Sequence, residues 1–375
     1  MRFISSVRPT LLMGVVGISL MLTACVSESE PVVTSTDTTD STETSDSDST
    51  TDDSETTTTT TFFSSAMFGS ALKSVTQASC TLENGSTTLC NVLVFSANGS
   101  GDTEGEGTVG PYCPDDITVA RSDTGMGIYD GDTNPGFQSL IDAVQSMDAD
   151  GYDVVNEDGT VNFNDATSMG DTSLNYCVSA ALESDLEVTY LIPITPEVRS
   201  EVYEIGTIAS VGVGLNGVPL KGNPPSVTIT DPAVRGTGSG NIPALDLCGG
   251  HPDPSGYYHW HMIPQSTNTV LESDQYSYTQ DYGMTCSNST IAFDEPAIFS
   301  GLAKDGYPIY GAYDSVNDEN VLPDTVATVD ECNGHTHATA EFTSGAYHYH
   351  ALENTAPNIP ACLTGSFVEN DVTVR

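Results

Sequence analysis

The seven histidines of this 375-residue chain all lie between residues 251 and 350. Six of them form the pairs His259/His261, His335/His337 and His348/His350, and His251 stands just upstream of the first pair. Neutral imidazole binds zinc, copper, iron and nickel, and ligand type together with geometry decides among them. The clustering therefore predicts a transition-metal site, with copper or zinc as its ion.

The histidines belong to a motif that occurs twice. The pattern Asp-x-Cys-x-Gly-His occupies residues 246–251 and again 330–335. The pattern Ser-Gly-x-Tyr-His-aromatic-His occupies residues 255–261 and again 344–350. A single His-x-His pair is easily explained by ordinary hydrogen bonding. Two copies with matching flanks favour a metal site.

The His-x-His spacing predicts strands with two different faces. In a strand, residues i and i+2 share one face, so each pair puts two imidazoles on one side and its aromatic rings on the other. Aromatic residues favour strands and bury a large apolar area, which directs their face toward a core. If the two repeats pair as neighbouring strands, four imidazoles meet on one face. These would be His259, His261, His348 and His350, with His251, His335 and His337 adjusting or completing the site.

Two functions are compatible with such a site. A centre with four imidazoles and every position filled indicates metal binding, storage or delivery. A zinc ion held by three histidines, with one open position, makes a bound water acidic enough to attack at neutral pH, as in a hydrolase or hydratase. That arrangement is similar to the zinc site of α-carbonic anhydrases, although the rest of the chain does not match that family.

A third alternative needs no metal. The histidine–tyrosine blocks would form a structural or adhesive surface domain that contacts a polymer or a partner protein. Imidazoles near their ordinary pKa would make that contact sensitive to pH. Such a protein would be purified without metal.

The beginning of the chain predicts export and a lipid anchor. Residues 1–24 have a basic start and an apolar run, which is typical of a signal peptide. The segment ends on Leu22-Thr23-Ala24-Cys25 and resembles a bacterial lipobox, which implies cleavage before Cys25 and acylation of its thiol. Plain secretory cleavage near Ala24 is the alternative. Residues 25–61 are mostly Ser, Thr, Asp and Glu and predict a disordered tether. The expected location is the cell envelope, with the outer membrane favoured.

The charge of the chain restricts its partners. Nine Lys and Arg stand against 52 Asp and Glu, which gives a formal net charge of −43. A field of this sign excludes nucleic acid and anionic membrane surfaces as partners, so membrane contact is expected through the lipid alone. The same field attracts metal cations, although solubility explains the acidity equally well.

Eight cysteines remain once Cys25 is set aside, and an even number in an exported chain indicates disulfides. Eight cysteines allow 105 pairings. Local closure gives the expected set Cys80–Cys90, Cys113–Cys177, Cys248–Cys286 and Cys332–Cys362. The alternative is that Cys248 and Cys332 are thiolate ligands, because each lies three residues before a histidine.

The remaining sequence predicts a mainly β fold of disulfide-bonded antiparallel sheets with few short helices. We expect an N-terminal β-rich region at 62–185 and the domain with the duplicated histidine motif at 186–366. Short runs rich in Val, Ile, Thr and aromatics, separated by turn residues, predict the strands. These runs are Cys90–Phe95, Leu186–Ile194, Ile208–Val213, Ser226–Thr230 and Ala292–Phe299. The best helix candidate is Phe137–Met147.

A second metal signal lies at residues 153–165, which resemble the calcium loop of EF-hand and dockerin modules. Oxygen ligands at positions three, five and nine, glycine at six and an acid at twelve are present. Position one is Val154 instead of Asp. An acidic, turn-rich loop is the alternative to a calcium site.

The motifs together resemble the YHYH-domain family of exported bacterial proteins, for which no reaction is established. The resemblance extends from about Cys80 to Gly365 and includes residues 110–114, 215–219, 248–261, 301–311, 330–335, 347–350 and 362–365. Trp260 replaces the middle tyrosine of the first block. Within residues 301–311, Asp305 is a candidate to accept the second N–H of a ligating imidazole. Capping of a turn is the alternative role for Asp305.

Overall fold

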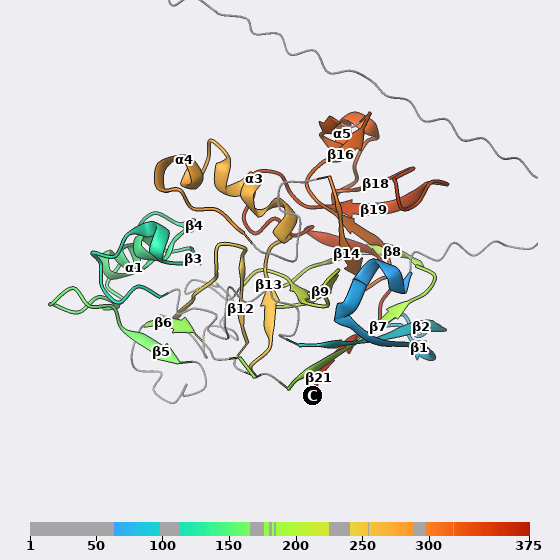
Figure 1. Ribbon diagram of the computed structural model, residues 1–375, viewed down its shortest axis with the longest axis horizontal. Helices are drawn as coiled ribbons and strands as arrows, with labels where there is room; N and C mark the ends of the chain where they lie inside the picture. Colours follow the sequence, from blue (N-terminus) through green and yellow to red (C-terminus); the bar gives the residue numbers. More distant parts are fainter. Residues whose placement is uncertain are drawn as a thin grey trace, which may run out of the picture. The chain divides into compact units, whose positions relative to one another are not determined.

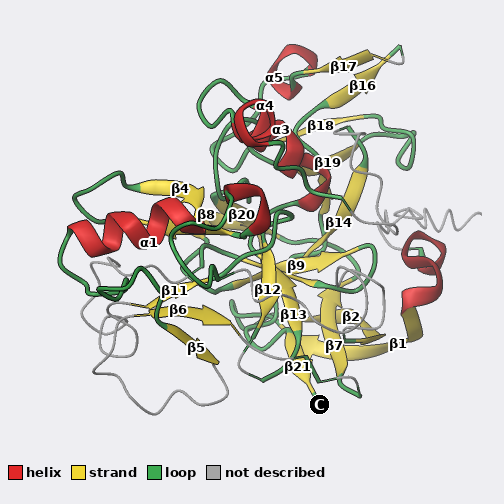
Figure 2. Ribbon diagram, turned by 60° about the vertical axis from the view of Figure 1, so that its left-hand side comes forward, coloured by secondary structure: helices red, strands yellow, loops and turns green. Residues whose placement is uncertain are grey.

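The fold was analysed in a computed structural model of the whole chain, which describes residues 64–97, 113–165, 176–179, 182–183, 185–224, 241–253, 255–287, 297–317 and 319–375. All of these residues lie in one compact unit that spans residues 58–375. The predicted signal peptide and tether lie outside the described residues. The described part is mainly β with a few short helices, which confirms the predicted fold class (Figure 2).

The largest sheet has eight strands in the order β12-β13-β10-β9-β14-β15-β19-β18. The strands are β9 (Ser210–Gly214), β10 (Pro219–Lys221), β12 (Gly250–Pro252), β13 (Tyr258–Trp260), β14 (Phe299–Ala303), β15 (Pro308–Tyr310), β18 (Gly334–His337) and β19 (Ala346–His350). Figure 1 shows the pairs β12–β13 and β18–β19 well separated, with β9 and β14 between them. Equivalent strands lie at mirrored positions in this order: β12 corresponds to β18, β13 to β19, β10 to β15 and β9 to β14.

The two halves of this sheet repeat each other. In the first half, β10 pairs in parallel with β13 at Leu220 and Trp260. In the second half, β15 pairs in parallel with β19 at Ile309 and Tyr349. Ile309 lies 89 positions after Leu220, and Tyr349 lies 89 positions after Trp260. The outer strands β12 and β18 each run antiparallel to the strand that carries a His-x-His pair. The duplication therefore covers a whole half-sheet, not the histidine motif alone.

The halves meet where β9 runs antiparallel to β14, with Val213 opposite Leu302. These two residues are themselves 89 positions apart, so a pseudo-twofold axis passes between them. Beside them, Gly212 and Gly301 allow the close contact. A Cβ on Gly212 would lie 2.1 Å from the Leu302 carbonyl oxygen, and one on Gly301 would lie 2.2 Å from that of Val213.

The aromatic face of the histidine strands lies in the core, as the alternation predicted. Trp260 and Tyr349 are buried in one cluster with Leu220 and Ile309. Burying such side chains stabilises the fold by about 1.5–3 kcal/mol each. Because side chains alternate, the histidines of both strands lie on the opposite face of the sheet.

A second sheet has the order β1-β2-β7-β21. Its strands are β1 (Leu72–Thr81), β2 (Thr87–Ser96), β7 (Glu187–Pro193) and β21 (Val372–Val374). Alternate residues of β2 and β7 are buried, among them Leu93, Phe95, Val188 and Tyr190. This pattern confirms the predicted strands at Cys90–Phe95 and Leu186–Ile194.

Smaller sheets and short helices complete the described part. The remaining strands are β3 (Met126–Tyr129), β4 (Gly136–Ser139), β5 (Phe163–Asp165), β6 (Tyr176–Ser179), β8 (Val198–Glu204), β11 (Asn241–Pro243), β16 (Asp314–Val316), β17 (Glu319–Val321) and β20 (Cys362–Gly365). The helices are α1 (Leu140–Ala149), α3 (Thr267–Glu272), α4 (Tyr278–Tyr282) and α5 (Pro323–Val326), with 3-10 turns η1 (Ser65–Ala71), η2 (Arg121–Asp123) and η4 (Pro264–Ser266). No helix among the described residues is long and apolar enough to cross a membrane.

Most local predictions can be compared with the structure. The helix predicted from Phe137 begins at Leu140, because residues 136–139 form β4 and Ser139 accepts a hydrogen bond from the Asp142 N–H. The strand predicted at Ile208–Val213 is confirmed as β9. Ser226–Thr230 and most of Ala292–Phe299 lie outside the described residues.

All four predicted disulfides are confirmed. Sulfur atoms are within bonding distance in Cys80–Cys90, Cys113–Cys177, Cys248–Cys286 and Cys332–Cys362. Each of the last two disulfides joins a histidine block to the segment that follows it. The alternative role for Cys248 and Cys332, as thiolate ligands, is therefore wrong, because both sulfurs are already bonded.

Candidate metal centres

The histidines form two separate clusters. The hypothesis that the two repeats pair as neighbouring strands is wrong, because β10, β9, β14 and β15 lie between β13 and β19. Each His-x-His strand pairs instead with the strand that carries its own upstream histidine. The result is a three-histidine cluster of His251, His259 and His261 and a four-histidine cluster of His335, His337, His348 and His350.

The three-histidine cluster is built by the hairpin of β12 and β13. The antiparallel register places His251 opposite His259, so both imidazoles lie on one face, and His261 follows two residues later on that face. The Nε2 atom of His261 lies 3.2 Å from that of His251 and 3.1 Å from that of His259. His259 and His261 are buried.

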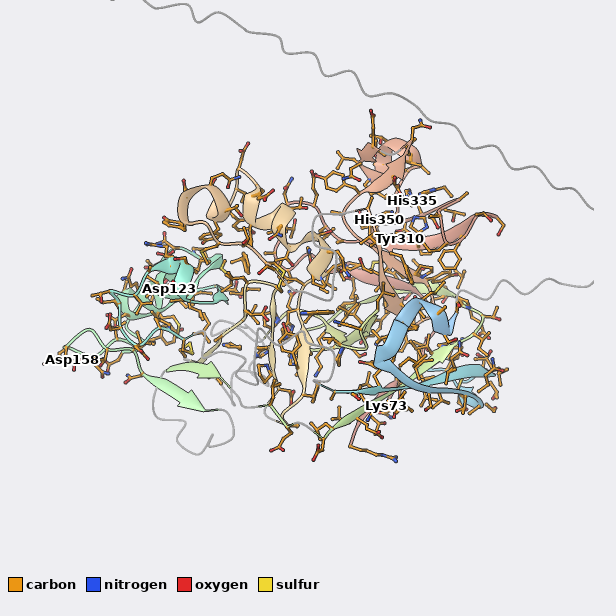
Figure 3. The ribbon with its side chains drawn as sticks, in the orientation of Figure 1. Lys73, Asp123, Asp158, Tyr310, His335 and His350 are labelled. Carbon is orange, nitrogen blue, oxygen red and sulfur yellow. A yellow bond between two sulfur atoms is a disulfide. The ribbon has the colours of Figure 1, made fainter. Side chains whose placement is uncertain are left out.

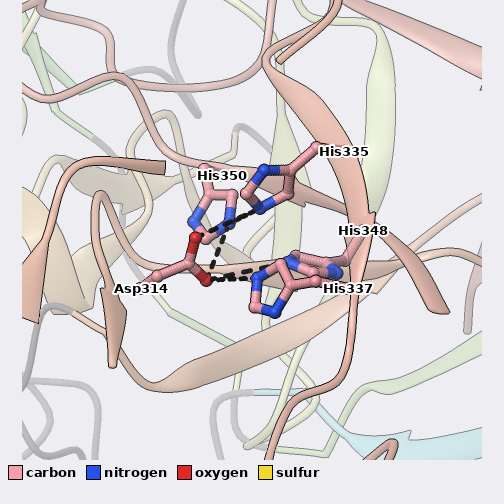
Figure 4. Close-up of side chains that lie close together, drawn as sticks. All are labelled: Asp314, His335, His337, His348 and His350. Atoms are coloured by element: carbon pink, nitrogen blue, oxygen red, sulfur yellow. Dashed lines mark hydrogen bonds and ion pairs between the residues drawn. The ribbon is translucent and has the colours of Figure 1, made fainter. Parts of the chain in front are cut away.

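The four-histidine cluster repeats this arrangement and adds two residues. His335 lies opposite His348, and His350 follows on the same face, while His337 extends β18. Asp314, at the start of β16, points its carboxylate into the group (Figure 4). Its Oδ1 lies 2.7 Å from Nε2 of His337 and 3.5 Å from Nε2 of His350, and its Oδ2 lies 3.2 Å from Nε2 of His335.

Backbone carbonyls orient the imidazoles of the four-histidine cluster. Nδ1 of His335 lies 2.9 Å from the Ala327 oxygen, and Nδ1 of His350 lies 2.8 Å from the Gly311 oxygen. Nδ1 of His337 and of His348 likewise face the oxygens of Ala338 and Ala346. A carbonyl oxygen only accepts, so in the neutral ring each Nδ1 carries the proton and each Nε2 presents a lone pair.

In the neutral rings, this arrangement leaves several buried acceptors without donors. Nε2 of His335 and Nε2 of His350 lie 3.1 Å apart, although two lone pairs cannot form a hydrogen bond. Nε2 of His348 is buried, lies 3.9 Å from the Asp314 carboxylate and has no hydrogen-bond partner among the described residues. Buried polar atoms are normally satisfied, so this group requires added protons or a cation.

The nitrogen separations also fit a metal ion. Tetrahedral coordination with Zn–N bonds of 2.0–2.1 Å places neighbouring nitrogens about 3.3 Å apart. In the three-histidine cluster, Nε2 of His261 lies 3.1–3.2 Å from those of His251 and His259, and in the four-histidine cluster Nε2 of His335 lies 3.1 Å from that of His350. Each cluster thus has the spacing of neighbouring ligands on one ion.

In the four-histidine cluster, Asp314 and the imidazoles shift each other's pKa values. Burial would raise the pKa of Asp314, but the imidazoles of His335, His348, His350 and His337 around its carboxylate hold that pKa well below its usual range. For His335, burial lowers the pKa, and the hydrogen bond to Asp314, together with the Ala327 carbonyl and nearby carboxylates, more than offsets this and raises it. Asp314 therefore stabilises positive charge at this cluster, from protons or from metal.

The imidazoles of the three-histidine cluster exclude protons, as does His350 of the other cluster, whose pKa burial lowers to about 3. Burial lowers the pKa of His251 to about 3 and those of His259 and His261 well below their ordinary value, with nearby Lys221 adding to each shift. Neutral imidazoles are the form that binds a metal ion. This cluster therefore keeps its nitrogens free for a metal well below neutral pH.

Asp305 does not support an imidazole. Its carboxylate accepts hydrogen bonds from the Tyr349 hydroxyl at 2.6 Å and from the backbone N–H groups of Tyr307 and Gly365. The prediction that it accepts an imidazole N–H is therefore wrong, because backbone carbonyls have that role. Its alternative role as the cap of a turn is confirmed by the bond from Tyr307.

Asp314 was missed by the sequence reasoning, because nothing in its spacing distinguishes it among 52 acidic residues. Lys221 was also missed as a neighbour of the imidazoles, and Tyr310, which the sequence placed at the border of a pocket or in the packing, was not linked to them. The repeated pattern Gly-x-Pro-x-x-Gly at residues 217–222 and 306–311 is the signal that could have identified them as equivalents. Figure 3 shows Tyr310 beside His335 and His350.

The predicted calcium loop forms a turn at residues 153–165. Its side chains bond to each other: Asn156 donates to Thr160 and Asn162, and Asp158 accepts from the backbone and hydroxyl of Thr160. These contacts explain the loop without an ion. Calcium binding stays a prediction.

Comparison with known proteins bears on kinship. The family described as YHYH protein matches residues 189–324. The matched segment contains the whole three-histidine cluster and Asp314 and ends before His335. No curated protein and no solved structure matches the chain. The predicted resemblance is thus confirmed for this segment, and residues 189–324 carry a YHYH domain.

Proposed function

We propose that this protein binds two transition-metal ions, copper or zinc, at separate histidine centres. The observation that carries the proposal is that the Nε2 atoms of His335 and His350 face each other as lone pairs, while the buried Nε2 of His348 has no hydrogen-bond partner among the described residues. A cation satisfies all of these acceptors at once. Soft thiolate ligands are absent from both clusters as described, and imidazole with carboxylate suits zinc and copper(II).

The two centres differ in the number of donors. The four-histidine cluster offers four nitrogens and a carboxylate, enough to surround an ion completely. Such a centre supports tight retention, in storage, delivery or stabilisation of the fold. The three-histidine cluster offers three nitrogens, and a tetrahedral ion bound there keeps one position for water or another ligand.

We further propose that the protein works in the cell envelope. The supports are the apolar, basic-started residues 1–24, the lipobox-like segment before Cys25 and the acidic segment 25–61. The four disulfides also suit an oxidising compartment. The lipid on Cys25 would hold the chain at a membrane.

Elemental analysis tests the proposal. The full chain would be exported to an oxidising periplasm, extracted in detergent and purified without a polyhistidine tag. We expect about two equivalents of copper or zinc, and about one after the double substitution His348→Ala and His350→Ala. Absence of metal after reconstitution with each ion would reject the proposal and favour a structural or adhesive role.

A zinc-dependent hydrolytic function is the second candidate. It rests on the three-histidine cluster alone, because only that cluster leaves a coordination position open. Zinc bound by three histidines lowers the pKa of its water to about 7. Zinc content at this centre without exchangeable water would exclude this candidate.

A further inference from the structure

Lys221 occupies the position in the first half-sheet that Tyr310 occupies in the second. Both are the last residue of a strand, β10 or β15, and they are 89 positions apart. Each precedes the glycine whose carbonyl oxygen faces a histidine Nδ1: Gly222 for His261, and Gly311 for His350. The two side chains therefore start from the same place beside their clusters.

Its contacts place Lys221 beside the three-histidine cluster. Leu220 lies opposite Trp260 and is buried with it, whereas Lys221, after an irregularity in the β9–β10 register, contacts Tyr257, whose ring packs beside that of His259. In the second half, the Tyr310 ring lies 4.9 Å from the His348 ring and 6.0 Å from the His350 ring. Lys221 thus places an ammonium group where the other half has a phenol.

The contacts of Lys221 position its ammonium group. The Nζ donates a hydrogen bond to the Tyr257 hydroxyl oxygen and lies 3.9 Å from Oδ2 of Asp253. The Tyr257 ring packs beside the His259 ring at 5.6 Å. The Lys221 side chain is 17% exposed, so it is largely shielded from water.

Asp253 in turn occupies the position of His337. Each lies two residues after the first histidine of its half, His251 or His335. In the four-histidine cluster this position supplies an imidazole, whereas in the three-histidine cluster it supplies a carboxylate that pairs with Lys221. The fourth nitrogen is therefore missing, and a cation–carboxylate pair stands next to the gap.

The two centres differ in their charged groups, since Lys221 stands in place of Tyr310 and Asp253 in place of His337. A divalent ion in the four-histidine cluster faces the negative Asp314. A divalent ion in the three-histidine cluster has three neutral ligands, and Lys221 and Asp253 cancel each other. One of only nine basic side chains in a chain with 52 acidic ones thus stands beside the centre that lacks an anionic ligand.

We propose that the three-histidine centre binds a small anion with a carboxylate or phosphate group, one oxygen on the metal ion and another on the Lys221 ammonium. The inference rests on the proposed metal binding and adds the class of ligand. The metal ion and Lys221 together supply two positive groups at this centre. Charge-assisted hydrogen bonds to carboxylate and phosphate are among the stronger polar contacts in proteins.

The test uses the full chain with His348→Ala and His350→Ala, so that copper(II) reports on the three-histidine centre alone. Acetate and inorganic phosphate are titrated separately, and the copper absorption and electron paramagnetic resonance spectra are recorded. Lys221→Met should weaken the affinity of the tighter anion by about tenfold or more, the effect of losing one charged hydrogen bond. Lys221→Arg should retain most of the affinity.

Lys73→Met is the matched control. Lys73 lies on β1, in the other sheet from β12 and β13, and pairs with Glu187. Its substitution should leave anion affinity unchanged. Equal affinity in the Lys221→Met and Lys73→Met proteins, or no response of the bound copper to either anion, would overturn the inference while leaving metal binding intact.

Absence of copper from the double variant and from wild type would reject the proposed function and, with it, the anion site. If the double variant alone fails to fold, wild type loaded at both centres replaces it. The four-histidine centre is then common to the Lys221→Met and Lys73→Met proteins, so their difference still reports on Lys221. Comparison of acetate with phosphate identifies the preferred class of anion.

Discussion

The two histidine clusters share one framework and differ in what is added to it. In both, a hairpin supplies three imidazoles, and a glycine carbonyl at the end of a neighbouring strand orients the last of them. The second cluster adds His337 and Asp314. The first has Asp253 in place of His337, and the residue 89 positions before Asp314 is Pro225, which has no donor and lies outside the described residues. Each half-sheet thus supplies three imidazole nitrogens. Single added side chains then decide how many further metal ligands each centre has.

The comparison also separates tight retention from reactivity. The cluster with five donors stabilises positive charge through Asp314 and supplies enough donors to surround an ion. The cluster with three donors keeps its imidazoles neutral and has Lys221 beside it. The same scaffold therefore serves two kinds of metal chemistry, and each can be altered without the other.

The largest effect expected is the loss of one centre at a time. His261→Ala should remove the metal of the three-histidine centre, and the double substitution His348→Ala and His350→Ala that of the four-histidine centre, because oriented ligands are lost in each variant. Total metal, measured by mass spectrometry after gel filtration, should fall from about two equivalents to about one in either variant. Loss of both ions in a single variant would show that the centres are one coupled site.

A second effect should be confined to the four-histidine centre. Asp314→Asn removes the carboxylate from the group and should weaken metal binding there by at least about 10–100-fold, the range for groups that only support a metal ligand, because a negatively charged donor is itself lost. Competition with a chromophoric chelator measures both affinities. Asp253→Asn is the control at the other centre and should leave the affinity of the four-histidine centre unchanged.

The metal-free protein should respond to acid in opposite ways at His259 and at His335. The folded pKa of His251 is about 3, and that of His259 is well below 6.5, so the unfolded chain binds protons more tightly. Their contribution to stability is complete above pH 6.5 and is lost as the pH falls toward 3. The pKa of His335 is raised, so its contribution is present below pH 6.5 and is lost as the pH rises through the folded value.

Melting temperatures between pH 7.5 and 4.5, in the presence of a chelator, test this contrast. His259→Gln should reduce the loss of stability in acid, whereas His335→Gln should increase it. Values at pH 7.5 serve as the reference for each variant. Parallel curves for the two variants would contradict the assignment of opposite shifts.

The smallest expected effect is on the fold alone. Asp305→Asn gives the second half the residue that the first half has at the equivalent position, Asn216. It weakens the bonds from Tyr349 and Gly365, so the free energy of unfolding should fall by about 1 kcal/mol and Tm by about 2–4 °C. Both metal affinities should stay the same. A weakened four-histidine centre would mean that Asp305 acts on the ligands after all.

The sequence predicted the parts of the site better than their assembly. The alternation of histidine and aromatic residues fixed which face of each strand is buried, and short chain separations favoured the four disulfides. The spacing could not reveal that β9 and β14 would separate the repeats, because glycines such as Gly212 and Gly301 indicate close contact without naming the partner. Asp314 could not be found because it reaches the imidazoles from a distant segment, and a carboxylate in an acidic chain has no distinguishing pattern.

The central pairing of β9 with β14 has a consequence for the origin of the two centres. Without the other half, each half would end in an unpaired edge strand, and such an edge is a template for another chain. Because Val213 and Leu302 face each other across the axis, two copies of one half could join through the same strand, as in an isologous dimer. The sheet thus has the construction of a dimer within one polypeptide. Two identical copies would carry the same ligands at both centres, so the covalent link is what allows one centre to gain a carboxylate and the other a lysine.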